Sequence, residues 1–288
     1  MIGRLARFVS LACGICMLVA CQPIQPPVRQ LIAAPDVPAA DTAPNDAIPP
    51  PHPLKLTILY DNTVTDARLT ADWGFAVLVE YDGDVLLFDT GAGPILLDNM
   101  EQLGIDPARI EMVVLSHEHD DHVGGLQALL DKGLQPAVYV PSTFSTYFKE
   151  RIRAQTELVE VTAPLEIRPG IYATGSADGM REQALLAETA SGSVLLVGCA
   201  HPGVVELVRK AEAIVPAKVA LLTGGFHLAS VTDESVLNTM IDDLRALGVA
   251  KIMPAHCTGD LASAMFKEAY GEAYSDAGAG RVVTLDDQ

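Results

Sequence analysis

Five side chains that can bind a metal ion lie within six consecutive positions of this sequence. They are His117, His119, Asp120, Asp121 and His122. Imidazole together with carboxylate suits a zinc-like or iron-like ion, whereas calcium and magnesium favour oxygen ligands alone. Alternate residues of an extended chain point the same way, so His117 and His119 can face one ion. Asp121 and His122, which come after a bend, can face a second ion.

The segments on either side of this motif predict where it lies in the fold. Residues 112–115 form an apolar run typical of a buried strand, and Gly124 and Gly125 introduce an apolar segment that predicts a helix. Loops at the carboxyl ends of strands are where open α/β sheets build their sites. The alternative is a solvated acidic loop that holds histidines by chance, and the density of ligands argues against it.

Three further histidines follow predicted strands elsewhere in the chain. His201, His227 and His256 each come shortly after an apolar run. Because the ends of neighbouring parallel strands lie close together, we expect these residues to converge on the same site. His52 lies in a proline-rich stretch without a neighbouring ligand, and we take it as incidental.

Asp89, Cys199 and His227 are possible additional members of the site. Asp89 ends a predicted strand and either caps a turn or orients a ligand histidine. Cys199 is either a ligand or a small buried residue, and two cysteines in the folded region, Cys199 and Cys257, do not make a disulfide framework. His227 is a ligand, a substrate contact or a satisfied core group, and its place after a strand favours the site.

The region from 54 to 288 repeats one order of elements. A hairpin, a glycine turn, a helix and a strand occur twice, about 110 residues apart. The first set covers residues 75–88, 89–93, 94–103 and 112–115, and the second covers residues 184–197, 198–203, 204–214 and 219–222. This period is too long for a solenoid repeat. It predicts an α/β fold of two similar halves that face each other, with the site along the seam.

Residues 1–20 have the features of a targeting segment, which we exclude from the fold. Arg4 and Arg7 precede an apolar stretch, residues 8–20, that is too short for a comfortable membrane span. The sequence Leu-Val-Ala-Cys at 18–21 resembles a bacterial lipoprotein signal, which is cleaved before Cys21 and carries a lipid on its sulfur. An ordinary secretory signal and a short anchor are the alternatives. By the same resemblance, Gln22 favours the outer membrane, with the protein facing the periplasm.

Residues 21–53 predict an extended tether between this lipid and the folded domain, residues 54–288. Ten prolines between positions 22 and 53 leave too few apolar residues to form a core. The whole chain has 49% hydrophobic residues, which is enough for a substantial core, and a net charge of −18. Such a surface repels phosphate backbones and argues against nucleic acid as the main partner. We therefore expect a small-molecule substrate, and contact with the membrane through Cys21.

The motif His-x-His-x-Asp-His within two such halves resembles the metallo-β-lactamase superfamily. One branch is more similar, namely that of 7,8-dihydropterin-6-yl-methyl-4-(β-D-ribofuranosyl)aminobenzene 5′-phosphate synthase. The segments that carry this similarity are residues 59–62, 73–75, 88–91, 198–203, 224–228 and 256–259. The resemblance implies a four-layer αββα sandwich with a metal site at the seam of the two halves.

The resemblance also implies two metal ions, zinc by preference, with iron and manganese as alternatives. The implied ligands are His117, His119 and His201 for the first ion and Asp121, His122 and His256 for the second. Ions of this type lower the pKa of bound water to about 7 and so supply hydroxide at neutral pH. Asp121 would also be catalytic, by orienting the nucleophile or passing a proton to the leaving group. The implied reaction is hydrolysis of an ester, amide, thioester or phosphoester.

Two other functions stay open. A synthase of the dihydropterin kind would use the same metals, although its phosphorylated substrates are cytosolic and the export signal argues against it. A metal-binding lipoprotein without catalysis is the other alternative, and the full ligand set argues against it.

The sequence departs from the family pattern at several positions. Glu118 and Asp120 stand where the branch usually has small or aromatic residues. Cys199 stands where many hydrolases of the superfamily carry an aspartate that bridges the two ions. Either Cys199 or His201 is therefore expected to take over a ligand role, or the second ion is bound more weakly.

The lipid anchor is tested by replacing its cysteine. We expect Cys21→Ser to abolish incorporation of a labelled fatty acid and to move the protein out of the membrane fraction, because the acyl chains provide the membrane affinity. His52→Ala, a change in the tether, is the control and should alter neither result. Unchanged lipid labelling of Cys21→Ser would refute the anchor.

Overall fold

The computed structural model describes residues 53–176 and 181–285. The predicted signal peptide and all but the last residue of the tether lie outside these ranges. Within them, no helix has the length and apolar character that crossing a membrane requires.

The described residues form two β-sheets. The first sheet has seven strands in the order β13-β1-β2-β3-β4-β5-β6. Its strands are β1 (Leu54–Tyr60), β2 (Ala76–Tyr81), β3 (Asp84–Phe88), β4 (Met112–Val114), β5 (Ala137–Pro141), β6 (Leu158–Val161) and β13 (Val282–Leu285). The second sheet has six strands in the order β12-β11-β10-β9-β8-β7. Its strands are β7 (Leu165–Arg168), β8 (Ile171–Ala173), β9 (Leu185–Thr189), β10 (Gly192–Val197), β11 (Val219–Gly225) and β12 (Ile252–Ala255).

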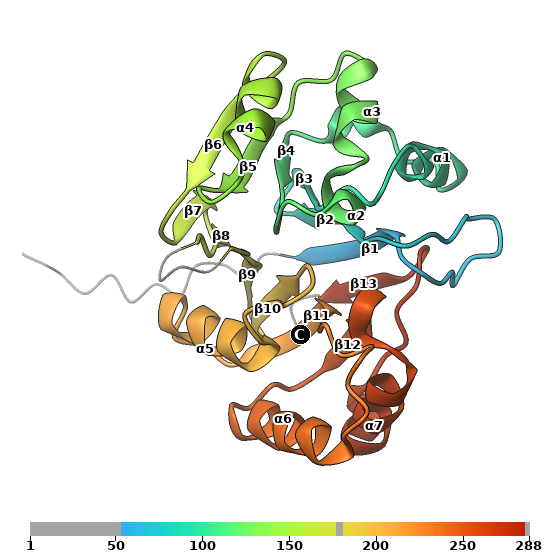
Figure 1. Cartoon of the computed structure of the whole chain (residues 1–288), viewed down its shortest axis with the longest axis vertical. Helices are drawn as coiled ribbons and strands as arrows, with labels where there is room; N and C mark the ends of the chain where they lie inside the picture. Colours follow the sequence, from blue (N-terminus) through green and yellow to red (C-terminus); the bar gives the residue numbers. More distant parts are fainter. Residues whose placement is uncertain (1–52, 177–180, 286–288) are drawn as a thin grey trace, which may run out of the picture. The chain divides into compact units, whose positions relative to one another are not determined.

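Helices cover the outer face of each sheet (Figure 1). In chain order the α-helices are α1 (Ile95–Gln102), α2 (Asp120–Val123), α3 (Leu126–Asp131), α4 (Thr146–Arg153), α5 (Val204–Ile214), α6 (Glu234–Ala246) and α7 (Asp260–Tyr270). Short 3-10 helices are η1 (Pro107–Arg109), η3 (His256–Thr258) and η4 (Gly271–Ala273). Figure 1 shows α1, α3 and α4 on one side of the molecule and α5, α6 and α7 on the other.

Three apolar clusters hold these layers together. The first lies between the sheets, where Leu56 and Val79 of one sheet belong to the same cluster as Leu196 of the other. The second packs the first sheet against α1, α3 and α4, and the third packs the second sheet against α5, α6 and α7. Burial of this apolar surface is the main force that favours the fold. The predicted four-layer αββα sandwich is confirmed.

The two halves repeat the same strand directions, as predicted. In β1–β5 and again in β8–β12, the first two pairings are antiparallel and the last two are parallel. The connections place the carboxyl ends of the parallel strands at one edge of each sheet. Five predicted site residues follow β3, β4, β10, β11 and β12 within three positions: Asp89, His117, Cys199, His227 and His256.

One local prediction was wrong. The motif was expected to be a loop throughout, but Asp120, Asp121 and His122 lie in the single-turn helix α2, where the amides of residues 122 and 123 both donate to the carbonyl of His119. Helix α4 begins at residue 146, because the Ser145 side chain accepts from the amide of residue 148 and caps its start.

The two glycines after the motif allow α2 and α3 to approach the loop that follows β3. A Cβ atom on Gly125 would lie 2.1 Å from the carbonyl oxygen of Thr90, and one on Gly124 would lie 2.2 Å from that of Ala92. Neither contact can be relieved by a side-chain rotation, because both involve backbone oxygens. The glycines therefore keep the metal motif pressed against the end of β3.

Gly125→Ala tests this close approach. We expect the free energy of unfolding to fall by about 1–3 kcal/mol, the usual cost of overpacking, as measured by urea denaturation. The matched control is Gly93→Ala in the same loop, where no atom lies within 4 Å of the added Cβ. An unchanged stability of Gly125→Ala would show that the helices do not depend on this contact.

Candidate metal centre

The loop after β4 presents four of the predicted ligands in two different backbone conformations. His117 lies at a bend shortly after β4, and His119 at the start of α2 is extended, with φ −93° and ψ 145°. Asp121 and His122 lie on the first turn of α2 itself. The change from extended chain to helix turns the second pair away from the first. The bend inferred from sequence is therefore a helix start.

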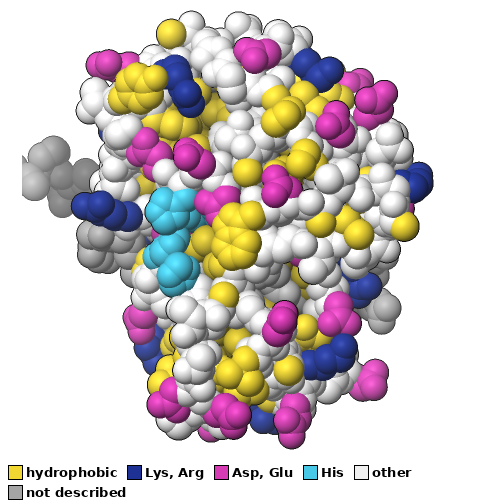
Figure 2. Space-filling model, turned by 45° about the vertical axis from the view of Figure 1, so that its right-hand side comes forward, with side chains coloured by type: hydrophobic (Ala, Val, Ile, Leu, Met, Phe, Trp, Pro, Cys, Tyr) yellow, Lys and Arg dark blue, Asp and Glu magenta, His cyan; other side chains and the backbone are white. Residues whose placement is uncertain are grey.

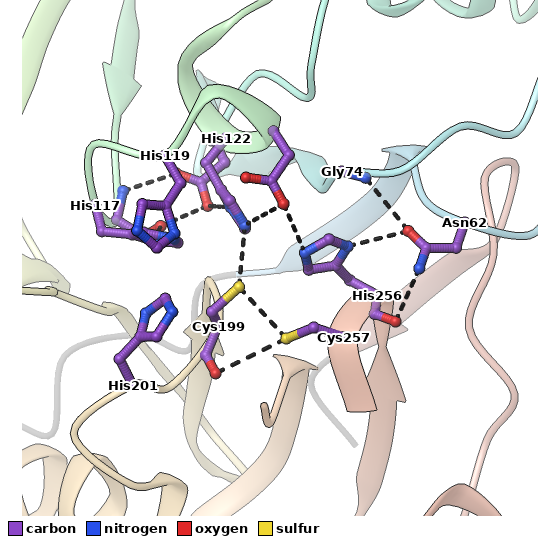
Figure 3. A network of polar contacts seen from close by, with 12 residues as sticks. Asn62, Gly74, His117, His119, His122, Cys199, His201, His256 and Cys257 are labelled. Atoms are coloured by element: carbon purple, nitrogen blue, oxygen red, sulfur yellow. Dashed lines mark hydrogen bonds and ion pairs between the residues drawn. The ribbon is translucent and has the colours of Figure 1, made fainter. Parts of the chain in front are cut away.

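The first predicted ligand trio comes together in the structure. One ligand atom from each of His117, His119 and His201 lies within 4.8 Å of the other two. His117 Nε2 and His119 Nδ1 are 3.0 Å apart. His201 approaches from the loop between β10 and α5, on the opposite half of the molecule (Figure 3).

The second predicted trio also comes together, beside the first. One ligand atom from each of Asp121, His122 and His256 lies within the same 4.8 Å limit. Asp121 Oδ2 is 3.2 Å from His256 Nε2 and 3.8 Å from His122 Nε2. The rings of His117 and His122 are 4.2 Å apart between centroids, so the two trios share one pocket at the seam.

Asp89 orients one histidine of each trio. His122 Nδ1 donates to Asp89 Oδ2 over 2.7 Å, and Ser116 donates to the same carboxylate from its amide and its hydroxyl. The Ser116 oxygen in turn lies 2.9 Å from His117 Nδ1. Asp89 is fully buried, and it thereby acts as the outer partner that the sequence allowed.

Glu182 and Asn62 hold the rings of two further ligands, His201 and His256. Glu182 Oε2 accepts from His201 Nδ1 over 2.8 Å, and Asn62 Oδ1 lies 3.0 Å from His256 Nδ1. With Asp89 and Ser116, these contacts occupy the Nδ1 atom of His117, His122, His201 and His256. Because a neutral imidazole that donates from Nδ1 keeps its lone pair on Nε2, all four rings present an acceptor nitrogen to the pocket.

The electrostatics of the pocket favour a neutral His117 and ionised carboxylates at Glu182 and Asp121. Burial lowers the pKa of His117 to about 2. Burial alone would raise the pKa of Glu182, but the hydrogen bonds that it accepts, above all from His201, lower it to about 2. Burial opposes ionisation of Asp121 as well, yet the adjacent His256 and His122 bring its pKa below the ordinary value. His117 and Asp121 therefore have the protonation states that a metal ion requires of its ligands. The carboxylates act the other way on two histidines, because Glu182 raises the pKa of His201 and Asp89 raises that of His122.

Backbone strain concentrates at the strand ends that carry the site. Four residues other than glycine adopt positive φ values there: Asp89 at 54°, Ala200 at 55°, His227 at 57° and His256 at 47°. Such conformations cost free energy and persist where the surroundings hold them. For His256 the restraint is visible, because its amide donates to Asp61 Oδ1 and its carbonyl accepts from Asn62 Nδ2.

The residues that depart from the family pattern lie in different surroundings, as does His227. The Glu118 carboxylate accepts from the Ser145 amide and hydroxyl at the start of α4, and Asp120 is exposed on α2. Cys199 Sγ lies 3.2 Å from His122 Nε2. His227 is exposed, and its ligand nitrogen lies within 4.8 Å of the sulfurs of Cys199 and Cys257. Both cysteines are free and buried.

This arrangement fits a pair of metal ions. Two groups of three donors meet in one pocket, and the donor set of imidazole and carboxylate suits zinc-like ions. His256 Nε2 is buried and makes no hydrogen bond, although the Asp121 carboxylate lies beside it. A buried acceptor without a partner costs free energy, and a bound cation would satisfy it.

A cavity of about 520 Å³ lies beside the metal centre, and both His256 and Trp73 line it. Trp73 is 54% exposed, and its ring lies 4.8 Å from that of His256 between centroids. Among the described residues, the cavity lining includes Asp61, Asp260 and Asp276 but neither lysine nor arginine. Figure 2 shows histidine side chains reaching the surface in one group, with acidic and hydrophobic side chains beside them. A substrate can therefore reach the pocket from solvent.

Sequence reasoning missed four residues of the site. Ser116 was read only as part of the motif, and Asp61 and Asn62 were noted for their resemblance to the family without a role. Glu182 was not considered, because a single acidic residue before a predicted strand carries no pattern. Only the fold brings it against the backbone of residues 199–201, where it accepts from three consecutive amides.

Comparison with known sequences identifies the family. A profile of the metallo-beta-lactamase superfamily matches residues 70–256. A relative from Methanocaldococcus jannaschii, named 7,8-dihydropterin-6-methyl-4-(beta-D-ribofuranosyl)-aminobenzene-5'-phosphate synthase, is 30% identical over 280 residues. That match covers 79% of this chain and 95% of the relative. The resemblance to this branch, which the sequence motifs suggested, is confirmed.

Solved structures agree with this result. The crystal structure of Tm1679, described as a metal-dependent hydrolase of the beta-lactamase superfamily, matches with a TM-score of 0.71 at 24% identity, covering 81% of this chain and 100% of that one. The metallo-beta-lactamase fold protein YhfI from Bacillus subtilis matches with a TM-score of 0.60 at 16% identity, over 81% of this chain and 100% of that one. The chain therefore belongs to the metallo-beta-lactamase superfamily.

Proposed function

We propose that this protein is a metal-dependent hydrolase with a centre for two zinc-like ions. The observation that carries the proposal is that two ligand trios meet in a single solvent-accessible pocket, each combining two residues of the motif with a histidine from the second half of the chain. Four of the histidine rings are already held by outer partners, so the donors do not have to be reorganised when ions bind. Binding free energy that is not spent on reorganisation makes the site tighter.

The residues of the chain divide the work of the reaction. When bound, two zinc-like ions supply Lewis acidity, by polarising a substrate oxygen and lowering the pKa of water. Asp121 is ionised at neutral pH and borders the pocket, so its carboxylate can accept a hydrogen bond from the attacking water and orient it. The same carboxylate can then carry a proton to the leaving group. Asp89, Glu182 and Asn62 keep the histidine rings in place during this step.

A synthase of the dihydropterin kind is the second candidate. Its support is the 30% identity to the archaeal synthase over nearly the whole of that relative. The cavity beside His256 argues against a phosphorylated substrate in that part of the site, because its described lining holds three carboxylates and neither lysine nor arginine, and only one of the three, Asp276, has a described lysine partner, Lys267. These carboxylates would repel the negative charge of a phosphate group, and they therefore favour a neutral or cationic substrate.

The cellular location that fits this proposal is the bacterial cell envelope. The lipoprotein-like sequence at 18–21 and the proline-rich stretch that follows support a lipid anchor on Cys21. The folded domain would then act on a small molecule in the periplasm, on the inner face of the outer membrane. The strongly acidic composition supports the view that nucleic acid is not its substrate.

Asp121→Ala tests the catalytic assignment. We expect the full-length chain to bind two divalent ions, and the variant to lose turnover by about 10²- to 10⁴-fold, as for the loss of a general acid–base group. The matched control is Asp120→Ala, since Asp120 is the adjacent, exposed aspartate and belongs to none of the ligand groups. The measurements are metal content by atomic emission and hydrolysis of ester, thioester, lactam and phosphoester substrates. A chelator should abolish activity and lower the melting temperature, because bound ions stabilise the folded state.

Two outcomes of these assays contradict the proposal. Full metal content and full activity in Asp121→Ala would show that the site is assigned wrongly. Two bound ions without turnover of any hydrolase substrate would favour the alternatives, and formation of the archaeal synthase's product would then separate the synthase from a metal-binding protein.

Trp73→Ala tests whether the cavity beside His256 binds substrate. We expect KM to rise by about 2- to 10-fold with a smaller change in kcat, because an aromatic contact of this kind contributes about 0.5–1.5 kcal/mol to binding. Val236→Ala on the outer helix α6 removes an exposed apolar side chain of 48% exposure and should change neither constant. An unaltered KM in Trp73→Ala would place the substrate elsewhere on the metal centre.

A further inference from the structure

We propose that the cavity beside the metal centre is a subsite for an alkylammonium group, which binds against the indole face of Trp73. The inference deepens the proposed hydrolase function and rests on it, because it names the class of substrate. That substrate is a small molecule that carries an organic cation next to the bond that is hydrolysed.

The backbone of Trp73 is held although its side chain faces solvent. The Trp73 amide donates to Asp72 Oδ1 over 2.8 Å, and Asp72 Oδ2 accepts from the Tyr60 hydroxyl over 2.9 Å. Tyr60 is buried, whereas the Trp73 residue is 54% exposed and lines the cavity. Because the loop is already fixed, a ligand that binds the indole does not have to order it first.

The residue after Trp73 joins the same loop to the metal centre. A Cβ atom on Gly74 would lie 2.6 Å from the backbone oxygen of Asp121. The Gly74 amide donates to Asn62 Oδ1 over 3.3 Å, and the same oxygen lies 3.0 Å from His256 Nδ1 (Figure 3). Asp121 and His256 both belong to the second ligand trio. A group bound on the indole is therefore held beside the position of the second ion.

The charge around the indole is negative. The Asp72 carboxylate is bonded to the Trp73 amide. The cavity lining adds three carboxylates, and among the described residues it holds neither lysine nor arginine. Carboxylates gathered at one cavity attract a cation and repel an anion.

Asp260 is the lining carboxylate that remains available to a ligand. Asp61 is buried and accepts from the His256 amide, and Asp276 pairs with Lys267 over 3.1 Å. Asp260 is exposed in the first turn of α7, and its carboxylate has no hydrogen bond or ion pair to another residue in the described ranges. We therefore expect Asp260 to supply the counter-charge for the bound cation.

An indole face and a carboxylate together select an organic cation. Tryptophan attracts a positive charge over its ring more strongly than the other aromatic side chains do. The alkyl groups of an alkylammonium ion also pack on the apolar ring, as those of an uncharged analogue do. The charge of the ligand, and not its shape, should therefore decide the affinity.

The fluorescence of Trp73 tests the subsite without reference to turnover, because Trp73 is the single tryptophan of the chain. The full-length protein is titrated with choline and, in parallel, with neohexyl alcohol, its uncharged carbon analogue. Both ligands carry the same hydroxyl group, so contact of that group with a metal ion does not separate them. We expect a saturable response to choline, with an affinity about 2- to 30-fold above that for neohexyl alcohol. Equal affinities, or no saturable response to choline, overturn the proposal.

Two exposed aspartates provide a matched pair of variants. Asp260→Asn removes a lining carboxylate and should weaken choline binding by about 2- to 5-fold without changing the affinity for neohexyl alcohol. Asp98→Asn on α1 makes the same change of charge outside this cavity and should leave both affinities unchanged. An equal loss in both variants would assign the effect to net charge alone and overturn the subsite.

Trp73→Leu separates the attraction of the ring for charge from simple apolar contact. Because this variant has no tryptophan, binding is read from the methyl resonances of the two ligands by saturation-transfer NMR. The preference for choline should disappear in Trp73→Leu and return in part in Trp73→Phe, and its persistence in Trp73→Leu overturns the role of the indole. A protein that prefers choline yet hydrolyses nothing retains the subsite and loses the proposed hydrolase function. A protein that hydrolyses its substrates without this preference loses the subsite alone.

Discussion

The buried carboxylate of Asp89 is the contact on which the rest of the centre depends. It ends β3, and through Ser116 and His122 it fixes the chain that leaves β4. One carboxylate therefore couples two neighbouring parallel strands to a histidine of each trio. Full burial raises the pKa of Asp89, and the bonds from Ser116 and His122 offset only part of that effect. This is why the loop, the short helix α2 and the two following glycines are all held against the end of β3.

In the second half of the molecule, a different buried carboxylate fixes the loop that carries the ligands. Glu182 receives three consecutive amides of residues 199–201 and the His201 ring, so it fixes the loop after β10 as Asp89 fixes the loop after β4. Asp61 and Asn62 do the same for His256 after β12. The strained backbone of Ala200 and of His256 is held by a polar bond from another segment in each case. The site therefore contains residues from both halves and lies at the seam between them.

Features that follow from regular spacing could be predicted from the sequence, whereas single contacts between distant residues could not. The dense motif at 117–122, the two similar halves and the histidines after strands follow from spacing and apolar runs, and the structure brings all six predicted ligands together. The start of α2 was missed because Asp120 and Asp121 gave no helical periodicity in so short a segment. Glu182 was missed because its partners are amides of a loop 17 to 19 residues away, and no spacing rule relates them. Contacts of this kind depend on tertiary structure, which local patterns do not encode.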